Sequence, residues 1–214
     1  MSIRVNPRLG GPMAFFDYLQ ILIAVILLCV IATKAIYLRV VTGVNPIVIG
    51  RGKGAWRIVE ILSLGSLLLW ITEVVLHAVH PRYDIFPQKV NVALLSGAAV
   101  KIFGLVLMSL GLITFILAFL SFGNSWRIGI DRKKPGTLVT KGIFSITRNP
   151  IYLAFDLLSF GMFLMNGTWF FLIFALLAAV ACHFQILREE EFLRRQYGQD
   201  FEKYRKRTAR YIVW

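Results

Sequence analysis

The polar segment between two strongly apolar runs, residues 136–152, carries the residues best suited to chemistry. It combines backbone donors with the guanidinium of Arg148, the side-chain amide of Asn149 and the phenol of Tyr152. Pro150 suits the first turn of a helix, because a proline there loses no hydrogen bond. Arg148 and Asn149 then lie at the positive N-terminal end of that helix, which suits an anion such as an amino acid carboxylate. The alternative is a helix cap whose basic residues face lipid head groups.

A second charged cluster, residues 188–191, closes the last long apolar run. The carboxylates of Glu189 and Glu190 can hold an ammonium group or ribose hydroxyls through charge-assisted hydrogen bonds. The alternative is a solvated start of a helix, in which the glutamates pair with Arg194 and Arg195 at helical spacing. Two such clusters at the ends of successive membrane spans can converge on one pocket at the bilayer surface.

Two further groups of polar residues lie within apolar runs. Asp156 is an acid inside a predicted span, and such a residue is a functional candidate that can also pair with Arg148. Glu73, His77 and His80 share one helix face, a spacing that can ligate zinc. Because they lie at the outer end of their span, an interfacial polar face is favoured and no metal site is predicted.

The apolar runs that must position these residues predict an all-α, polytopic integral membrane protein. With 57% hydrophobic residues and a mean hydropathy of +0.70, the 214-residue chain carries too little charge for a soluble domain of its size. A spanning helix needs about 20 apolar residues, and the candidates are residues 15–38, 56–79, 92–122 and the long run 151–187. Asn166-Gly167 breaks the last run into two short helices joined by a tight turn, which gives about five spans in all.

The basic residues predict an orientation for these spans. Most of the 24 Lys and Arg residues lie in alternate loops and in the C-terminal tail, which places the C-terminus in the cytoplasm and the N-terminus outside. An amphipathic cytoplasmic helix is expected over residues 189–206. Because lipid head groups explain the net charge of +13, the lipid bilayer is the predicted partner and nucleic acid is not. Cys29 and Cys182 lie in apolar runs and predict buried thiols rather than a disulfide.

Three glycines recur every seven residues in the run 92–122: Gly97, Gly104 and Gly111. They fall roughly on one helix face, and such a stripe lets a neighbouring helix approach closely in lipid. The stripe also permits a dimer, so the oligomeric state stays open.

Three motifs occur in order in the C-terminal portion of the chain. They read Leu138-Val139-Thr140-Lys141-Gly142, Arg148-Asn149-Pro150-Ile151-Tyr152 and Glu189-Glu190-Glu191-Phe192-Leu193. The last continues through Tyr197-Gly198 to Phe201 and Tyr204. With these motifs, residues 122–211 resemble the isoprenylcysteine carboxyl methyltransferase family, which is related to membrane phospholipid methyltransferases. The resemblance covers less than half of the chain.

The resemblance implies that S-adenosylmethionine is the cofactor. It assigns the cofactor to Thr137, Leu138, Val139, Phe144, Asn149, Pro150, Tyr152 and Glu189. The family's motif histidine is replaced by Asn149, so a titratable group is lost and catalysis by positioning is favoured over a dedicated base. Gln185 stands where prenyl-cysteine enzymes have an arginine associated with the substrate carboxylate, which puts a carboxyl acceptor in question.

The predicted function is that of an integral-membrane methyltransferase dependent on S-adenosylmethionine and acting at the cytoplasmic membrane face. Residues 1–121 are predicted to form a three-span scaffold and residues 122–214 the cofactor-binding region, with Arg148 and Glu190 as catalytic residues. The acceptor is expected to be lipid-like, prenylated, or a small thiol or carboxyl compound. Two alternatives stay open. An NADPH-dependent membrane reductase of similar architecture would prefer NADPH to S-adenosylmethionine, whereas a non-catalytic membrane protein would bind neither.

Overall fold

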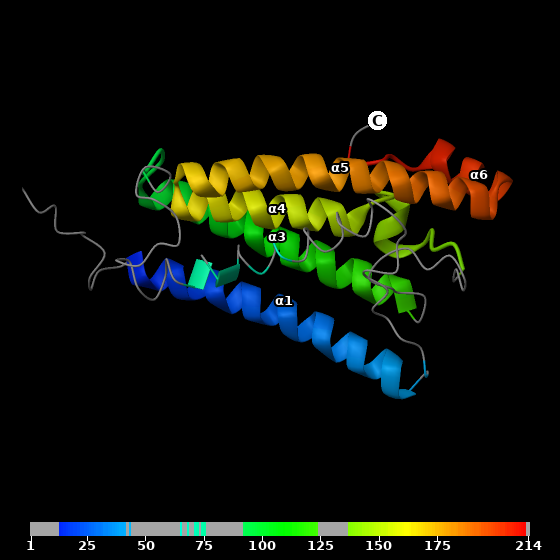
Figure 1. Cartoon of the computed structure of the whole chain (residues 1–214), viewed down its shortest axis with the longest axis horizontal. Helices are drawn as coiled ribbons and strands as arrows, with labels where there is room; N and C mark the ends of the chain where they lie inside the picture. Colours follow the sequence, from blue (N-terminus) through cyan, green and yellow to red (C-terminus); the bar gives the residue numbers. More distant parts are fainter. Residues whose placement is uncertain are drawn as a thin grey trace, which may run out of the picture.

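The computed structural model is a bundle of long helices that lie side by side (Figure 1). It describes residues 13–41, 43, 65, 68, 71–72, 74–75, 92–123 and 137–212. The elements are α1 (Met13–Val41), α3 (Ala98–Phe122), the short 3-10 helix η2 (Gly142–Ser145), α4 (Pro150–Asn166), α5 (Trp169–Tyr197) and α6 (Gln199–Arg207). The described part of the chain therefore confirms the predicted all-α class.

Three of these helices are long and apolar enough to cross a membrane: Phe15–Val41, Ala98–Phe122 and Trp169–Tyr197. The fourth, α4, has 17 residues and a length of about 26 Å, slightly short of the hydrocarbon thickness of about 30 Å. It packs between α3 and α5, so its neighbours help to bury it. A polytopic membrane protein is confirmed. The predicted span 56–79 lies largely outside the described residues, and so do Glu73, His77 and His80.

The end of α5 differs from the prediction. The amphipathic helix was expected to begin at Glu189, but the helix of the last span continues through this position to Tyr197. It ends at Gly198, where φ is 50°, a left-handed value that favours glycine. With 29 residues, α5 is about 44 Å long and exceeds the hydrocarbon thickness. Its glutamates therefore lie on a rigid extension of a membrane span, and only α6 is a separate amphipathic helix.

Close packing of α3 against α4 depends on glycines. A Cβ on Gly104 would lie 2.7 Å from the carbonyl oxygen of Gly161, and a Cβ on Gly161 would lie 2.7 Å from that of Gly104. Gly111 meets the backbone of α4 in the same way. Gly97 does not, because it is the N-cap of α3 and a Cβ there would meet nothing within 4 Å. The predicted close approach of α3 and α4 is thus confirmed for two of the three glycines. The helix of the third span begins at Ala98 rather than at residue 92.

The turn between α4 and α5 fixes the end of the bundle opposite to the start of α4. Gly167 has φ 66° and ψ 23°, as expected for the predicted Asn-Gly turn. Its carbonyl oxygen accepts a hydrogen bond from the N–H of Leu94 at 2.6 Å. Asn166 Nδ2 donates to Oε1 of the fully buried Gln20 at 2.9 Å. Hydrogen bonds therefore tie α1, α4 and the segment before α3 together at this end.

Candidate functional site

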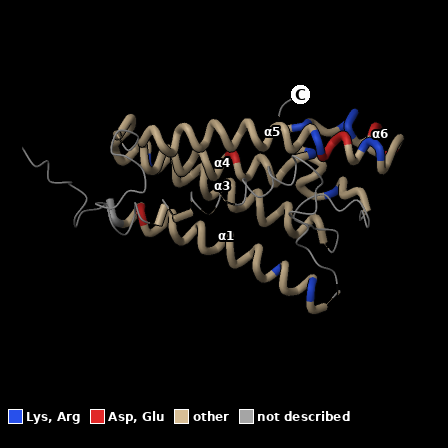
Figure 2. The backbone as a smooth tube through the Cα atoms, viewed as in Figure 1, with Lys and Arg blue, Asp and Glu red and all other residues tan. Residues whose placement is uncertain are grey.

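Charged residues of the described chain gather where α5 ends and α6 follows (Figure 2). The start of α4 lies at the same end, with Pro150 in its first turn as predicted and Asn149 as its N-cap. The Asn149 side chain makes no capping hydrogen bond to its own helix. Its Nδ2 donates instead to Glu190 Oε1 at 3.1 Å and to the carbonyl oxygen of Arg210 at 3.2 Å. The loop before α4 is therefore joined to α5 through this amide.

Glu190 is the centre of a buried ionic cluster, which we call the Glu190 clamp and which comprises Arg148, Asn149, Glu190 and Arg210. The Glu190 side chain is only 6% exposed. Its Oε1 accepts from Nε of Arg148 at 3.1 Å and lies 3.0 Å from the Nη2 atom of that residue. Its Oε2 accepts from Nε and Nη2 of Arg210 at 3.2 and 2.9 Å. Two guanidinium partners and an amide offset the cost of burying this carboxylate. Hydrogen bonding to Glu190 raises the pKa of Arg210 above its ordinary value, so Arg210 stays charged at neutral pH.

The residues after α6 fold back over the loop before α4 and complete the clamp. Arg148 donates to the backbone carbonyls of Thr208 and Ala209 in this segment and to that of Arg205 in α6. Thr147 Oγ1 donates to the carbonyl oxygen of Arg210 at 3.1 Å. Arg210 was not among the predicted site residues. No spacing in the sequence marks it, because it stands among many basic residues and its partner is 20 positions away.

Glu189 and Glu190 contact different partners. The hydroxyl of Tyr152 donates to Glu189 Oε1 at 2.6 Å, and Gln185 lies near both side chains. Arg188 Nη1 in turn donates to Gln185 Oε1 at 3.0 Å. Gln185, the predicted departure from the prenyl-cysteine enzymes, therefore lies beside the Tyr152–Glu189 pair and accepts from Arg188. Together these groups present a carboxylate, a phenol and an amide between α4 and α5, which suits an ammonium or hydroxyl ligand.

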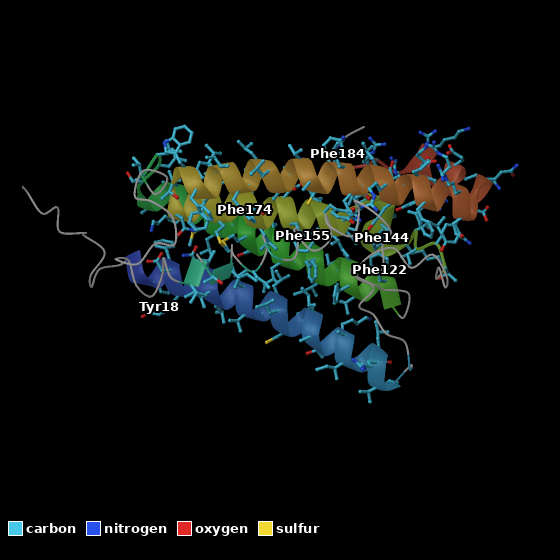
Figure 3. All side chains as sticks on the ribbon, viewed as in Figure 1. Tyr18, Phe122, Phe144, Phe155, Phe174 and Phe184 are labelled. Atoms are coloured by element: carbon cyan, nitrogen blue, oxygen red, sulfur yellow. The ribbon has the colours of Figure 1, made fainter. Side chains whose placement is uncertain are left out.

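Phe144 anchors the same loop from the side of α3. It is 5% exposed, and its ring meets that of Phe122 edge-on with centroids 4.8 Å apart (Figure 3). The hydroxyl of Tyr204 donates to the carbonyl oxygen of Phe144 at 2.7 Å. Burial raises the pKa of Tyr204 above its ordinary value, so the hydroxyl stays protonated as this bond requires. The remaining predicted cofactor residues precede η2 without regular secondary structure, and their role stays a prediction: Thr137, Leu138 and Val139.

Asp156 lies one helical turn beyond Tyr152, further into the bundle. Its Oδ1 atom is buried and has no hydrogen-bond partner among the described residues. Arg148, an expected partner of Asp156, is instead paired with Glu190 within the Glu190 clamp. Asp156 lies near Cys182 of α5 and Tyr211 of the C-terminal segment. An acid inside a membrane bundle with an unsatisfied oxygen is a candidate for function.

One family comparison bears on this arrangement. The model of the phospholipid methyltransferase family matches residues 99–200, from the start of α3 to the start of α6. The match includes the Tyr152–Glu189 pair, whereas Arg210 lies beyond it. No curated protein matches the chain significantly. Residues 99–200 therefore match a phospholipid methyltransferase domain, of the family that includes the isoprenylcysteine carboxyl methyltransferases, and this match supports a membrane methyltransferase in general.

Proposed function

We propose that this methyltransferase takes its methyl group from S-adenosylmethionine and transfers it at the cytoplasmic membrane face. The proposed acceptor is lipid-like, prenylated, or a small thiol or carboxyl compound. The observation that carries the proposal is the Tyr152–Glu189 pair, which is held between α4 and α5 beside the Glu190 clamp. It offers a carboxylate and a phenol to a cationic, hydroxyl-rich cofactor inside a domain of a methyltransferase family.

S-adenosylmethionine supplies a methyl group that is bonded to a sulfonium. Transfer of this methyl group is an in-line displacement in which the sulfur loses its positive charge. A site shielded from water favours such a displacement. Glu189 would hold the ammonium group or the ribose hydroxyls of the cofactor. The N-terminus of α4, behind Asn149 and Pro150, provides positive backbone dipoles for its carboxylate. The phenol of Tyr152 fixes the rotamer of Glu189 through the 2.6 Å hydrogen bond.

Arg148 and Glu190, the predicted catalytic residues, support catalysis in this proposal by positioning. Their side chains are 7% and 6% exposed and bind each other, so the loop before α4 is held at a fixed distance from α5. A displacement of about 1 Å at a reacting centre can reduce a rate by about a hundredfold. The clamp therefore contributes through geometry, consistent with the absence of a histidine from this loop.

The proposed orientation has the N-terminus outside and the C-terminus in the cytoplasm, as the distribution of Lys and Arg favours. In the proposed division of labour, residues 122–214 bind the cofactor and residues 1–121 form the scaffold. The family match begins at residue 99, so α3 belongs to both the scaffold and the matched region.

Transfer of a labelled methyl group tests the function. Purified protein is incubated with S-adenosylmethionine labelled on the methyl carbon and with a total lipid extract from the native membranes. Label is then counted in the lipid and small-thiol fractions. We expect label in one of these fractions with the wild type, and much less with Glu189→Gln when the concentration of S-adenosylmethionine is near the wild-type Kd. Equal label with both proteins would contradict the proposed site.

If the acceptor must lose a proton, Asp156→Asn is expected to lower the rate of this transfer by about a hundredfold or more, the lower end of the contribution of one general base. The reason is that Asp156 has an unsatisfied buried oxygen one turn beyond Tyr152, where it can take a proton from an acceptor. Binding of S-adenosylmethionine should be unchanged. Asp200→Asn is the matched control, because that carboxylate is 81% exposed. Full activity of Asp156→Asn would exclude this role.

A further inference from the structure

A second polar site is lined by residues of the loop that carries Phe144. It is an open pocket of about 460 Å³ between η2 and the end of α6. Its lining residues are Thr140, Lys141, Gly142, Ser145, Arg207 and Thr208. They supply two cations and three hydroxyl groups, and this lining contains no acidic side chain from the described chain. Such a set suits a phosphate group, which accepts hydrogen bonds and carries negative charge.

The two cations of the pocket differ from the basic residues around them. Lys203 and Arg205, on the same helix as Arg207, lie 3.9 and 3.0 Å from acidic side chains of that helix. Neither Lys141 nor Arg207 forms an ion pair with any carboxylate that the structure describes. Their charge is therefore available to a ligand, whereas Lys203 and Arg205 are paired within α6.

The walls of the pocket are held by contacts within the protein. Gly142 has φ 65°, and a Cβ there would lie 2.5 Å from Ser121 Oγ at the end of α3. Ser145 Oγ donates to the carbonyl oxygen of Gly142 at 2.7 Å. Thr208 is only 3% exposed, and its carbonyl oxygen is bound by Arg148. A site whose walls are fixed in advance loses less entropy when it binds a ligand.

The position of the pocket indicates a lipid rather than a soluble anion. Its η2 wall packs against the end of the spanning helix α3 through Phe122, so the pocket lies at the level of the membrane surface. Ile146, directly after the pocket residue Ser145, is 64% exposed. An exposed isoleucine beside unpaired cations is typical of a surface that contacts the boundary between head groups and acyl chains.

We propose that this pocket binds the phosphate of an anionic phospholipid head group, with Lys141 and Arg207 as its charged ligands. The site is separate from the Tyr152–Glu189 pair, and lipid binding there does not depend on methyl transfer. It would hold the cytoplasmic end of the bundle against an anionic bilayer and fix the position of η2, which carries Phe144.

Lipid binding to purified protein in neutral detergent tests this site. Dioleoyl phosphatidic acid is the probe, dioleoyl phosphatidylcholine is the zwitterionic reference, and inorganic phosphate is the soluble source of the same group. Binding is followed by native mass spectrometry and by the shift in Tm. The pocket variant is Lys141→Gln with Arg207→Gln. The matched control is Lys203→Gln with Arg205→Gln, which removes the same net charge outside the pocket.

The expected result is that phosphatidic acid binds the wild type and raises its Tm, and that the pocket variant binds about tenfold more weakly for each cation removed. The control should stay close to the wild type. Equal losses in the two variants, or no binding by the wild type, would overturn the proposal. Inorganic phosphate binding as tightly as phosphatidic acid would overturn the lipid assignment.

Calorimetry with S-adenosylmethionine on the same variants separates this proposal from the proposed function. Both variants should keep the affinity of the wild type for this cofactor. If the pocket variant loses the cofactor but keeps phosphatidic acid, the pocket belongs to the methyltransferase site and the lipid proposal fails. If the wild type binds phosphatidic acid but not the cofactor, the proposed function fails and the lipid site stands.

Discussion

Glu190→Ala is expected to destabilise the protein by about 3–5 kcal/mol, the usual cost of removing one partner from a buried ion pair. The substitution leaves the guanidinium of Arg148, whose side chain is 7% exposed, without its carboxylate. It also frees Arg210 and the amide of Asn149. The segment after α6 should then detach from the loop before α4. Thermal unfolding in detergent, followed by tryptophan fluorescence, measures the loss as a lower Tm.

Glu191→Ala is the matched control for this substitution. The neighbouring glutamate is on the same helix and has the same charge, but it is 46% exposed and pairs with arginines at the surface. Surface pairs of this kind contribute at most about 1 kcal/mol. If the two alanine variants unfold at the same temperature, the Glu190 clamp does not hold the C-terminal segment in place.

Glu189→Gln and Tyr152→Phe are expected to weaken binding of S-adenosylmethionine, by at least about tenfold for Glu189→Gln and by less for Tyr152→Phe. A hydrogen bond to a charged group contributes about 1.5–3 kcal/mol, and a tenfold change in affinity corresponds to about 1.4 kcal/mol. Tyr152→Phe keeps the carboxylate but removes the hydroxyl that orients it. Calorimetry on both variants gives the two affinities.

The control for these variants is Glu191→Gln, which removes a negative charge from the same helix at an exposed position. Unchanged affinity in this control, together with a Tm for Glu189→Gln near that of the wild type, would assign the loss to the site. Wild-type affinity in Glu189→Gln would instead show that the Tyr152–Glu189 pair does not contact the cofactor.

The architecture was largely predictable because lipid imposes a strong pattern on the sequence. Runs of apolar residues mark spans, and the Asn166-Gly167 break marked the α4–α5 turn, where Gly167 adopts φ 66°. The position of Pro150 in the first turn of α4 followed from its fixed backbone geometry. These features depend on local composition, and a single sequence contains that information.

The end of α5 was not predictable from the same pattern. Hydropathy falls at Glu189 because the chain leaves the hydrocarbon there, but a backbone helix continues wherever its residues permit it. The helix ends only at Gly198, with φ 50°. The sequence becomes polar at Glu189, but the helical backbone does not end there. The prediction assumed that both changes occur at the same residue.

Arg210 and the separate partners of Glu189 and Glu190 also required the structure. Adjacent glutamates on a helix point about 100° apart, so one meets Tyr152 on α4 and the other meets Arg148 and Arg210. The contact with Arg210 forms only when the segment after α6 folds back. The sequence motifs identified both glutamates, but only the tertiary arrangement separates a candidate ligand from a buried clamp.

Calorimetric titration of the wild-type protein in detergent with S-adenosylmethionine, and in parallel with NADPH, tests the central claim most directly. We expect saturable binding of S-adenosylmethionine and of its demethylated product S-adenosylhomocysteine, and much weaker binding of NADPH. Tighter binding of NADPH by a well-folded sample, or no binding of either cofactor, would contradict the assignment of the Tyr152–Glu189 site to S-adenosylmethionine.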